Sequence, residues 1–283
     1  MPLTLHWHTE PFLLLTLLIP GWLYALAVGP WRETIAPGET YPRKHAIRFF
    51  SALIVTYLAV GSPLDAVGET FLFCAHMLQH MLLIYVVPYF VITGLPAWLT
   101  DNFLLRRPRL LKVAKVLVHP VCGGASFTIL FTIWHFPELY VWALNDKEAH
   151  ILEHWMMFAP AVLMMWPVVS NSRVLPRARE GTLMLYGFLL MIGDLPLWAA
   201  LIFGDDPIYR TYEFAPRICY LSPIQDQISG AIVMKVFNEG FSLMTMGCAF
   251  FRWSKKETDH QKETAESSGS AARKRAAETS IAD

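Results

Sequence analysis

Seven long apolar stretches are the feature that most limits how this chain can fold. A helix needs about 20 apolar residues to cross a hydrocarbon core about 30 Å thick, and seven segments come near that length. Backbone groups in lipid must be hydrogen-bonded within the protein, so such segments cross a membrane as helices. The expected spans are residues 12–28, 46–61, 71–95, 116–135, 151–169, 183–203 and 228–253. The sequence therefore predicts an all-α, polytopic membrane helix bundle with about seven transmembrane helices.

Composition agrees with this class and excludes others. Hydrophobic residues make up 54% of the chain and charged residues 16%, which is too apolar for an ordinary soluble domain. The 23 basic and 23 acidic residues balance, so no net charge favours nucleic acid as a partner. The four cysteines are scattered and form no Cys-x-x-Cys pair, so they indicate neither a disulfide framework nor a thiolate metal site.

The distribution of lysine and arginine predicts the orientation in the membrane. The loops after the first, third and fifth expected spans hold most of these residues, and such loops stay in the cytoplasm. The N-terminus is therefore expected outside a cell inner (plasma) membrane and the C-terminus in the cytoplasm. From Ser254 onward the chain has too few large apolar residues to fold alone. We expect residues 1–253 to form the membrane domain and residues 254–283 to form a disordered cytoplasmic tail.

Histidines gather on the outer side in this orientation, which receives seven of the ten. His76 and His80 lie four residues apart in the third expected span, so they project from one helix face. This spacing suits joint ligation of a metal ion. His135 ends the fourth span at the same level. A second set lies on one stripe at the start of the fifth span: His150, Glu153, His154 and Met157.

The chemistry of these side chains favours a metal or haem site. Imidazole binds copper, zinc, iron and nickel, and thioether sulfur favours Cu(I). Met77 and Met81 each follow a histidine of the third span, although a single methionine in a core is usually a packing residue. A single membrane histidine is usually explained by an interhelical hydrogen bond. Several at one depth are costly and indicate function. The candidate ligands are His76, His80, His135, His150, His154 and Glu153, with Met77, Met81 and Met157 as auxiliary sulfur donors.

Two further groups of polar residues leave alternatives open. His6 and His8 flank Trp7, which suits residues at the membrane interface, and a capture site for an arriving ion is the alternative. Asp194 in the sixth span and Lys235 and Glu239 in the seventh predict a buried, mutually neutralised polar network, with a role in ion movement as the alternative.

The motifs together resemble the seven-helix CtaG family of cytochrome c oxidase assembly factors, which is distinct from the single-span copper chaperone of the same name. The resemblance rests on His76-Met-Leu-Gln79-His80, Trp134-His135-Phe-Pro137 and His150-x-x-Glu153-His154. It continues through Asp194-x-Pro196-Leu-Trp198, Ala215-Pro216-Arg217, Asp226-Gln227 and Met234.

The resemblance implies a role in the maturation of haem-copper oxidases. We expect a protein that is not an enzyme but binds copper on its outer-leaflet histidines. It would deliver this copper to the active-site copper centre in subunit I of the oxidase. The expected partners are that subunit, extracytoplasmic copper chaperones and membrane lipid, and no nucleic acid.

Two alternatives come from other classes of protein. His150-x-x-Glu153-His154 matches the inverted zinc-protease pattern, in which the glutamate is the general base. Histidines on facing spans could also ligate a haem iron in a membrane electron carrier. Haem proteins more often place one axial histidine on each of two helices, whereas here each helix carries two on one face. A visible spectrum separates haem from copper, because only haem gives an intense Soret band.

Overall fold

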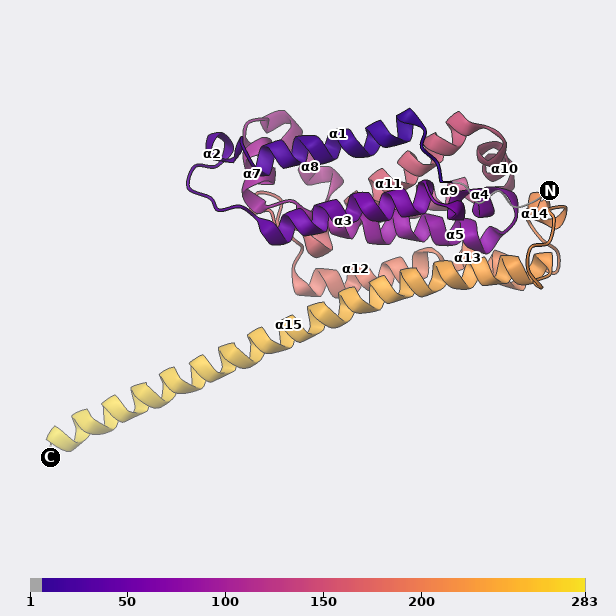
Figure 1. The fold of residues 1–283 in the computed structure, drawn as a ribbon. Helices are drawn as coiled ribbons and strands as arrows, with labels where there is room; N and C mark the ends of the chain where they lie inside the picture. Colours follow the sequence, from indigo (N-terminus) through magenta and orange to yellow (C-terminus); the bar gives the residue numbers. More distant parts are fainter. Residues whose placement is uncertain (1–6, 283) are drawn as a thin grey trace.

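The part of the chain that the structure describes is mostly helical and contains no strand. The structure is a computed structural model that describes the backbone of residues 7–282 and the side chains of residues 7–264. Figure 1 shows most of the long helices lying side by side, with α15 extending beyond the others. The predicted all-α class is confirmed.

Sixteen elements follow one another along the described chain. The first eight are α1 (Pro11–Val28), α2 (Arg32–Ile35), α3 (Arg43–Val60), α4 (Pro63–Thr70), α5 (Phe73–Met81), the π-helical turn η1 (Leu82–Val86), α6 (Val87–Gly94) and α7 (Ala97–Leu105). The remainder are α8 (Pro108–Leu117), α9 (Pro120–Trp134), α10 (Pro137–Asn145), α11 (Lys147–Val169), α12 (Glu180–Gly193), α13 (Leu195–Phe203), α14 (Arg210–Glu213) and α15 (Pro223–Ala282).

Fewer helices than the seven predicted are long and apolar enough to cross a membrane. In the described residues, four segments are long and apolar enough to cross a membrane: Pro11–Val28, Phe73–Gly94, Lys147–Val169 and Glu180–Phe203. The count rises to six if α3 with α4, bent by 43°, and α8 with α9, bent by 67°, each form one span. The seventh expected span lies within α15, where Lys235, Asn238 and Glu239 lower the apolar character. A polytopic membrane bundle is confirmed, and the number seven stays a prediction.

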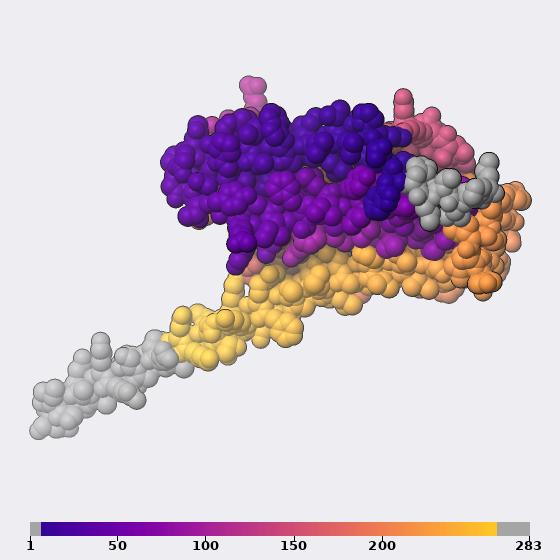
Figure 2. Space-filling view, viewed as in Figure 1, coloured from indigo at the N-terminus to yellow at the C-terminus, as the bar shows by residue number. Residues whose placement is uncertain are grey.

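The end of the chain continues the last helix. Helix α15 runs on past Trp253 to Ala282, and Figure 2 shows its last coloured residues projecting from the packed bundle. This stretch contains no proline and many alanine, glutamate, lysine and arginine residues, which favour helix. The division into a membrane domain and a separate tail at residue 254 stays a prediction.

Helix α5 lies at the centre of the packing. It contacts both α4 and α15, while α11 packs against α9, α6 and η1. The Asp226 carboxylate on α15 caps α5 by accepting hydrogen bonds from the backbone N–H groups of Phe73 (2.8 Å) and Cys74 (3.0 Å). These donors at a helix start have no partner within the helix. Asp226 therefore fixes α5 against α15.

Close helix contact also depends on a small residue between α9 and α11. A Cβ atom added at Gly123 would lie 2.6 Å from the carbonyl oxygen of Leu163. Small residues let membrane helices approach closely where apolar burial gives no drive for association. The α9 and α11 backbones are therefore in direct contact, which fixes the position of α11 in the bundle.

Candidate metal centre

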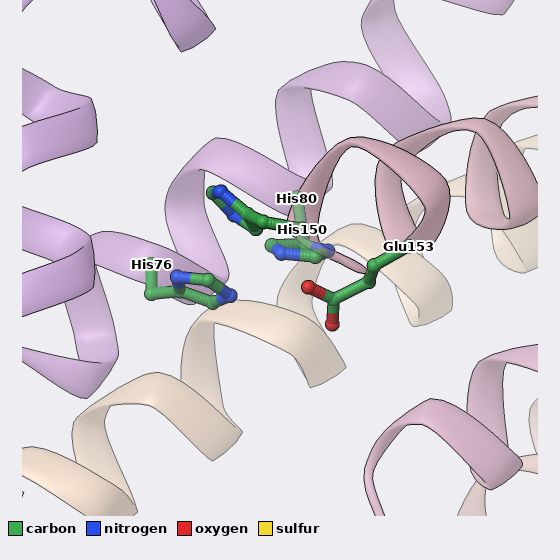
Figure 3. A group of neighbouring side chains, drawn as sticks. All are labelled: His76, His80, His150 and Glu153. Carbon is green, nitrogen blue, oxygen red and sulfur yellow. The ribbon is translucent and has the colours of Figure 1, made fainter. Parts of the chain in front are cut away.

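Two helices bring four of the predicted ligands together. Helix α5 supplies His76 and His80, and α11 supplies His150 and Glu153. One ligand atom from each of the four residues lies within 4.8 Å of those of the others, and all four residues are buried. Figure 3 shows the four side chains reaching from the two helices towards one another. We call this group the histidine–glutamate centre.

Helical spacing accounts for the pairs within each helix. The ring centroids of His76 and His80 are 4.3 Å apart, and those of His150 and His154 are 4.2 Å apart. Residues four apart lie on one face of a helix, so each pair points in one direction. Across the two helices, the rings of His76 and His150 stack with their centroids 5.7 Å apart.

The π-helical turn η1 follows His80 after one residue. Its five residues, Leu82–Val86, widen the helix directly after the histidine pair. Two residues later Pro88 lacks the backbone N–H that an α-helix would use, which interrupts the regular hydrogen-bond ladder. Such turns are rare and occur often at functional sites. The irregular segment and the candidate ligands therefore share one helix.

Unpartnered buried atoms distinguish this centre from ordinary core packing. Both ring nitrogens of His76 have no hydrogen-bond partner, and neither do Nε2 of His80, Nε2 of His150 or the two carboxylate oxygens of Glu153. Buried polar groups are nearly always hydrogen-bonded, because burying one without a partner costs roughly 2–7 kcal/mol. Other unpartnered buried atoms are spread over the described chain, but six of them gather at this centre. A metal ion bound between the two helices would satisfy several of them at once.

The donor set fits a transition metal in kind and in size. Imidazole nitrogens and a carboxylate oxygen are ligands for zinc and copper. Bonds of about 2.0–2.2 Å in a tetrahedral arrangement place the ligand atoms roughly 3.3 Å apart. The ligand atoms here lie within 4.8 Å of one another, so the longer of these distances must shorten when a metal binds. Rotation of side chains on fixed helices supplies a change of this size.

Softer and additional donors lie beside the centre. Nδ1 of His80 lies 2.8 Å from the sulfur of Met157. Of the predicted sulfur donors, Met157 is therefore the one placed in direct contact with a histidine of the centre within the described residues. The His154 ring lies 5.2 Å from that of His80, and its Nε2 has no partner. Because thioether sulfur favours Cu(I), Met157 extends the range of metals that this position suits.

The remaining predicted ligands lie elsewhere. His135 caps the end of α9, its Nδ1 lies 2.7 Å from the carbonyl oxygen of Phe131, and it is not in the four-residue group. Met77 and Met81 belong to the hydrophobic core. Met77 faces Gly230 of α15, and Met81 lines a small cavity beside Tyr85. His6 lies outside the described residues, so only His8 of that pair is placed.

Sequence reasoning missed the carboxylate that contacts the centre from outside. Oε1 of Glu69, on α4, lies 2.6 Å from Nδ1 of His150. A carboxylate on the second ring nitrogen is the usual support of a metal-binding histidine, because it fixes the tautomer and the ring orientation. The sequence held a signal for this residue, since Asp65 and Glu69 are the acidic residues in the short loop between the second and third expected spans.

Tyrosines cover the centre at the same end of the bundle. The Tyr140 ring lies 5.3 Å from that of His76. The Tyr140 hydroxyl is 2.8 Å from the hydroxyl of Tyr212, which donates to the carbonyl oxygen of Gly68. This chain of contacts ties α10 and α14 to α4 and shields His76 from solvent.

The three polar residues of the last two expected spans also meet. Nζ of Lys235 lies 3.1 Å from a carboxylate oxygen of Asp194 and 2.6 Å from one of Glu239. The side chains are 16–22% exposed. Lys235 thus bridges two carboxylates, and it also lies 5.4 Å from the centroid of the Trp198 ring.

The fold and the site define a class: a polytopic helical membrane protein with a buried histidine–glutamate centre that suits a metal ion. The family model described as "Cytochrome c oxidase caa3 assembly factor (Caa3_CtaG)" matches residues 22–256. The chain therefore belongs to this family of cytochrome c oxidase assembly factors, which confirms the resemblance found in the sequence. No curated protein and no solved structure matches the chain significantly.

Proposed function

We propose that the protein binds copper at the histidine–glutamate centre and delivers it to the active-site copper centre in subunit I of a haem-copper oxidase. The observation that carries this proposal is the convergence of unpartnered buried donors from His76, His80, His150 and Glu153. Membership of a family of cytochrome c oxidase assembly factors supports the oxidase as the recipient. Copper is the cargo in this proposal and no chemical reaction is catalysed.

The chemistry of transfer supports copper as the cargo. Imidazole binds copper well, and the neighbouring sulfur of Met157 favours Cu(I). The resemblance implies a recipient copper that is held by histidines within the membrane. Passing copper from histidine to histidine at a similar depth exchanges like ligands and keeps the ion away from water. Because only α5 and α11 supply the four ligands, a small shift between these helices would release two ligands together.

Metal analysis of the purified protein tests the cargo. We expect the detergent-solubilised wild type, reconstituted with copper in the presence of competing zinc, to retain about one copper per chain. It should show no Soret band, because no haem is bound. A stoichiometric preference for zinc would instead favour the zinc-enzyme alternative, and an intense Soret band would favour the haem-binding electron carrier. Either result contradicts the proposal.

We further propose that the centre lies in the outer leaflet of the plasma membrane, with the C-terminus in the cytoplasm. The support is the concentration of lysine and arginine in alternate loops. Figure 1 shows α4, α10 and α14 at one end of the bundle and the far end of α15 at the other.

Reporter fusions test this orientation. A reporter fused after Lys256 is expected in the cytoplasm, and one inserted near Asp146 is expected outside. The positions flank opposite ends of the bundle, so two reporters on the same side of the membrane would contradict the arrangement. Accessibility of each reporter to a membrane-impermeant reagent gives the measurement, with a reporter at Lys112 as a second cytoplasmic position.

A further inference from the structure

A row of polar side chains on α4 leads from the histidine–glutamate centre to the surface. Glu69, which contacts His150, has a side chain that is 36% exposed. One turn earlier on the same helix, an oxygen of Asp65 lies 3.4 Å from Nε2 of His8. The other oxygen of Asp65 accepts a hydrogen bond from the amide of Gln79 on α5. Residues four apart share a helix face, so both carboxylates lie along one side of α4.

We propose that Asp65, Glu69 and His8 form an outer cation-binding site through which the copper cargo reaches the buried centre. This inference rests on the proposed function, since it adds an access step to the same centre. His150 is the side chain shared between the two sites, because one ring nitrogen contacts Glu69 and the other faces no hydrogen-bond partner.

Unpartnered atoms deeper in the protein support this assignment. Gln79 is fully buried beside Asp65, and its Oε1 has no hydrogen-bond partner. Both carboxylate oxygens of Glu153 are also buried without a partner. Oxygen and nitrogen donors thus continue from the partly exposed Glu69 side chain to the ligands of the centre. An ion that follows them exchanges its water molecules for protein ligands in steps, and avoids the large cost of losing all of them at once.

The close packing of α4 and α5 holds this row in place. A Cβ atom added at Gly68 would lie 2.9 Å from the backbone nitrogen and Cα of His76. Only a glycine allows the two backbones to approach this closely. The next residue along α4 is Glu69, so the contact at Gly68 brings its carboxylate to His150. The outer site and the buried centre are therefore parts of one rigid arrangement.

Loading kinetics separate an access site from simple support of His150. A carboxylate that only orients the ring changes affinity and release. A pair of carboxylates that attracts an incoming cation changes the rate of loading, and does so most at low ionic strength. The two roles therefore differ in a quantity that can be measured directly.

The test uses the full-length protein in detergent with the double variant Asp65→Asn/Glu69→Gln. Copper is supplied as Cu(II) and, with ascorbate, as Cu(I), and loading is stopped at set times with a chelator before metal analysis. We expect the loading rate constant to fall about 10-fold or more at low salt. Copper is supplied in an excess that fills the centre to the same final content even if loss of the Glu69 support to His150 lowers its affinity. The difference from wild type should shrink as ionic strength rises. The matched control, Glu138→Gln/Asp205→Asn, removes two exposed carboxylates, one on α10 and one between α13 and α14, and should load like wild type.

Three results would overturn the outer site. These are an unchanged loading rate, a change confined to copper release, and a loss of final copper content that matches loss of a ligand. If the double variant does not fold, Glu69→Gln alone should show the same slower loading to a smaller degree. A wild type that takes up no copper would instead overturn the proposed function, which distinguishes the two failures.

Discussion

Cells that carry His76→Ala/His80→Ala are expected to make an oxidase that contains its haems but lacks its active-site copper. The double substitution removes two of the four buried donors from one face of α5. The donors that remain, His150 and Glu153 with the neighbouring His154 and Met157, all lie on α11, so no second helix closes the site and copper binding should fall steeply. Alanine suits a helix, and the substitution removes buried ring nitrogens that mostly have no protein partner, so the fold should survive.

The measurement is the copper-to-haem ratio in the isolated oxidase, taken beside the abundance of the variant protein in membranes. Oxygen consumption through the enzyme should fall in parallel. Copper added to the medium is expected to restore part of it by bypassing the donor. The purified variant should also have lost most of its copper at equal protein yield.

The matched control is His119→Ala/His260→Ala, which removes two exposed histidines outside the centre. These cells should keep a normal copper-to-haem ratio and normal oxygen consumption. If cells with His76→Ala/His80→Ala also keep a normal ratio at normal protein abundance, the delivery proposal is wrong.

Local sequence spacing predicted the parts of the centre that lie on one helix. The pairs on α5 and α11 follow from the helical period, because residues four apart must share a face. The partners between helices depend on how each helix is rotated in the bundle. Spans that are apolar all round do not reveal this rotation in their pattern. For this reason the sequence could not separate Met157, which contacts His80, from Met77, which faces α15.

The positions of the prolines explain where the helices break. They do not determine whether two helices that meet at a break form one membrane span. Pro63 and Pro120 each occupy the first helical position after a bend, where a missing N–H costs nothing. In the sequence, Ser62-Pro63 directly follows the second expected span. Whether the short helix α4 continues the span of α3 or lies across the membrane surface depends on its packing against α5. That packing requires Gly68, whose role only the structure reveals.

Replacing Lys235 by methionine is expected to lower the free energy of unfolding by about 3 kcal/mol, the low end of the cost of breaking a buried ion pair, because the three side chains are 16–22% exposed. The ammonium group lies between the carboxylates of Asp194 and Glu239, at 3.1 Å and 2.6 Å. Its removal leaves two acidic groups close together, with no cation between them, in an environment of low dielectric constant. The measurement is thermal or denaturant unfolding in detergent. As a control, Lys256→Met breaks an exposed pair with Glu180 and should cost less than about 1 kcal/mol.

Joint neutralisation distinguishes a true triad from three independent polar residues. Asp194→Asn/Lys235→Met/Glu239→Gln removes all three charges, so no carboxylate is left without its cation. The triple variant should therefore be more stable than Lys235→Met alone, because replacing a whole buried ionic group costs less than breaking it. A double-mutant cycle between Asp194→Asn and Lys235→Met should give a coupling well above the roughly 0.5 kcal/mol within which independent sites add. Additive effects would show that Lys235 is not paired with Asp194 in the protein, and the charged residues of the last two expected spans would then have to be tested for a role in ion movement.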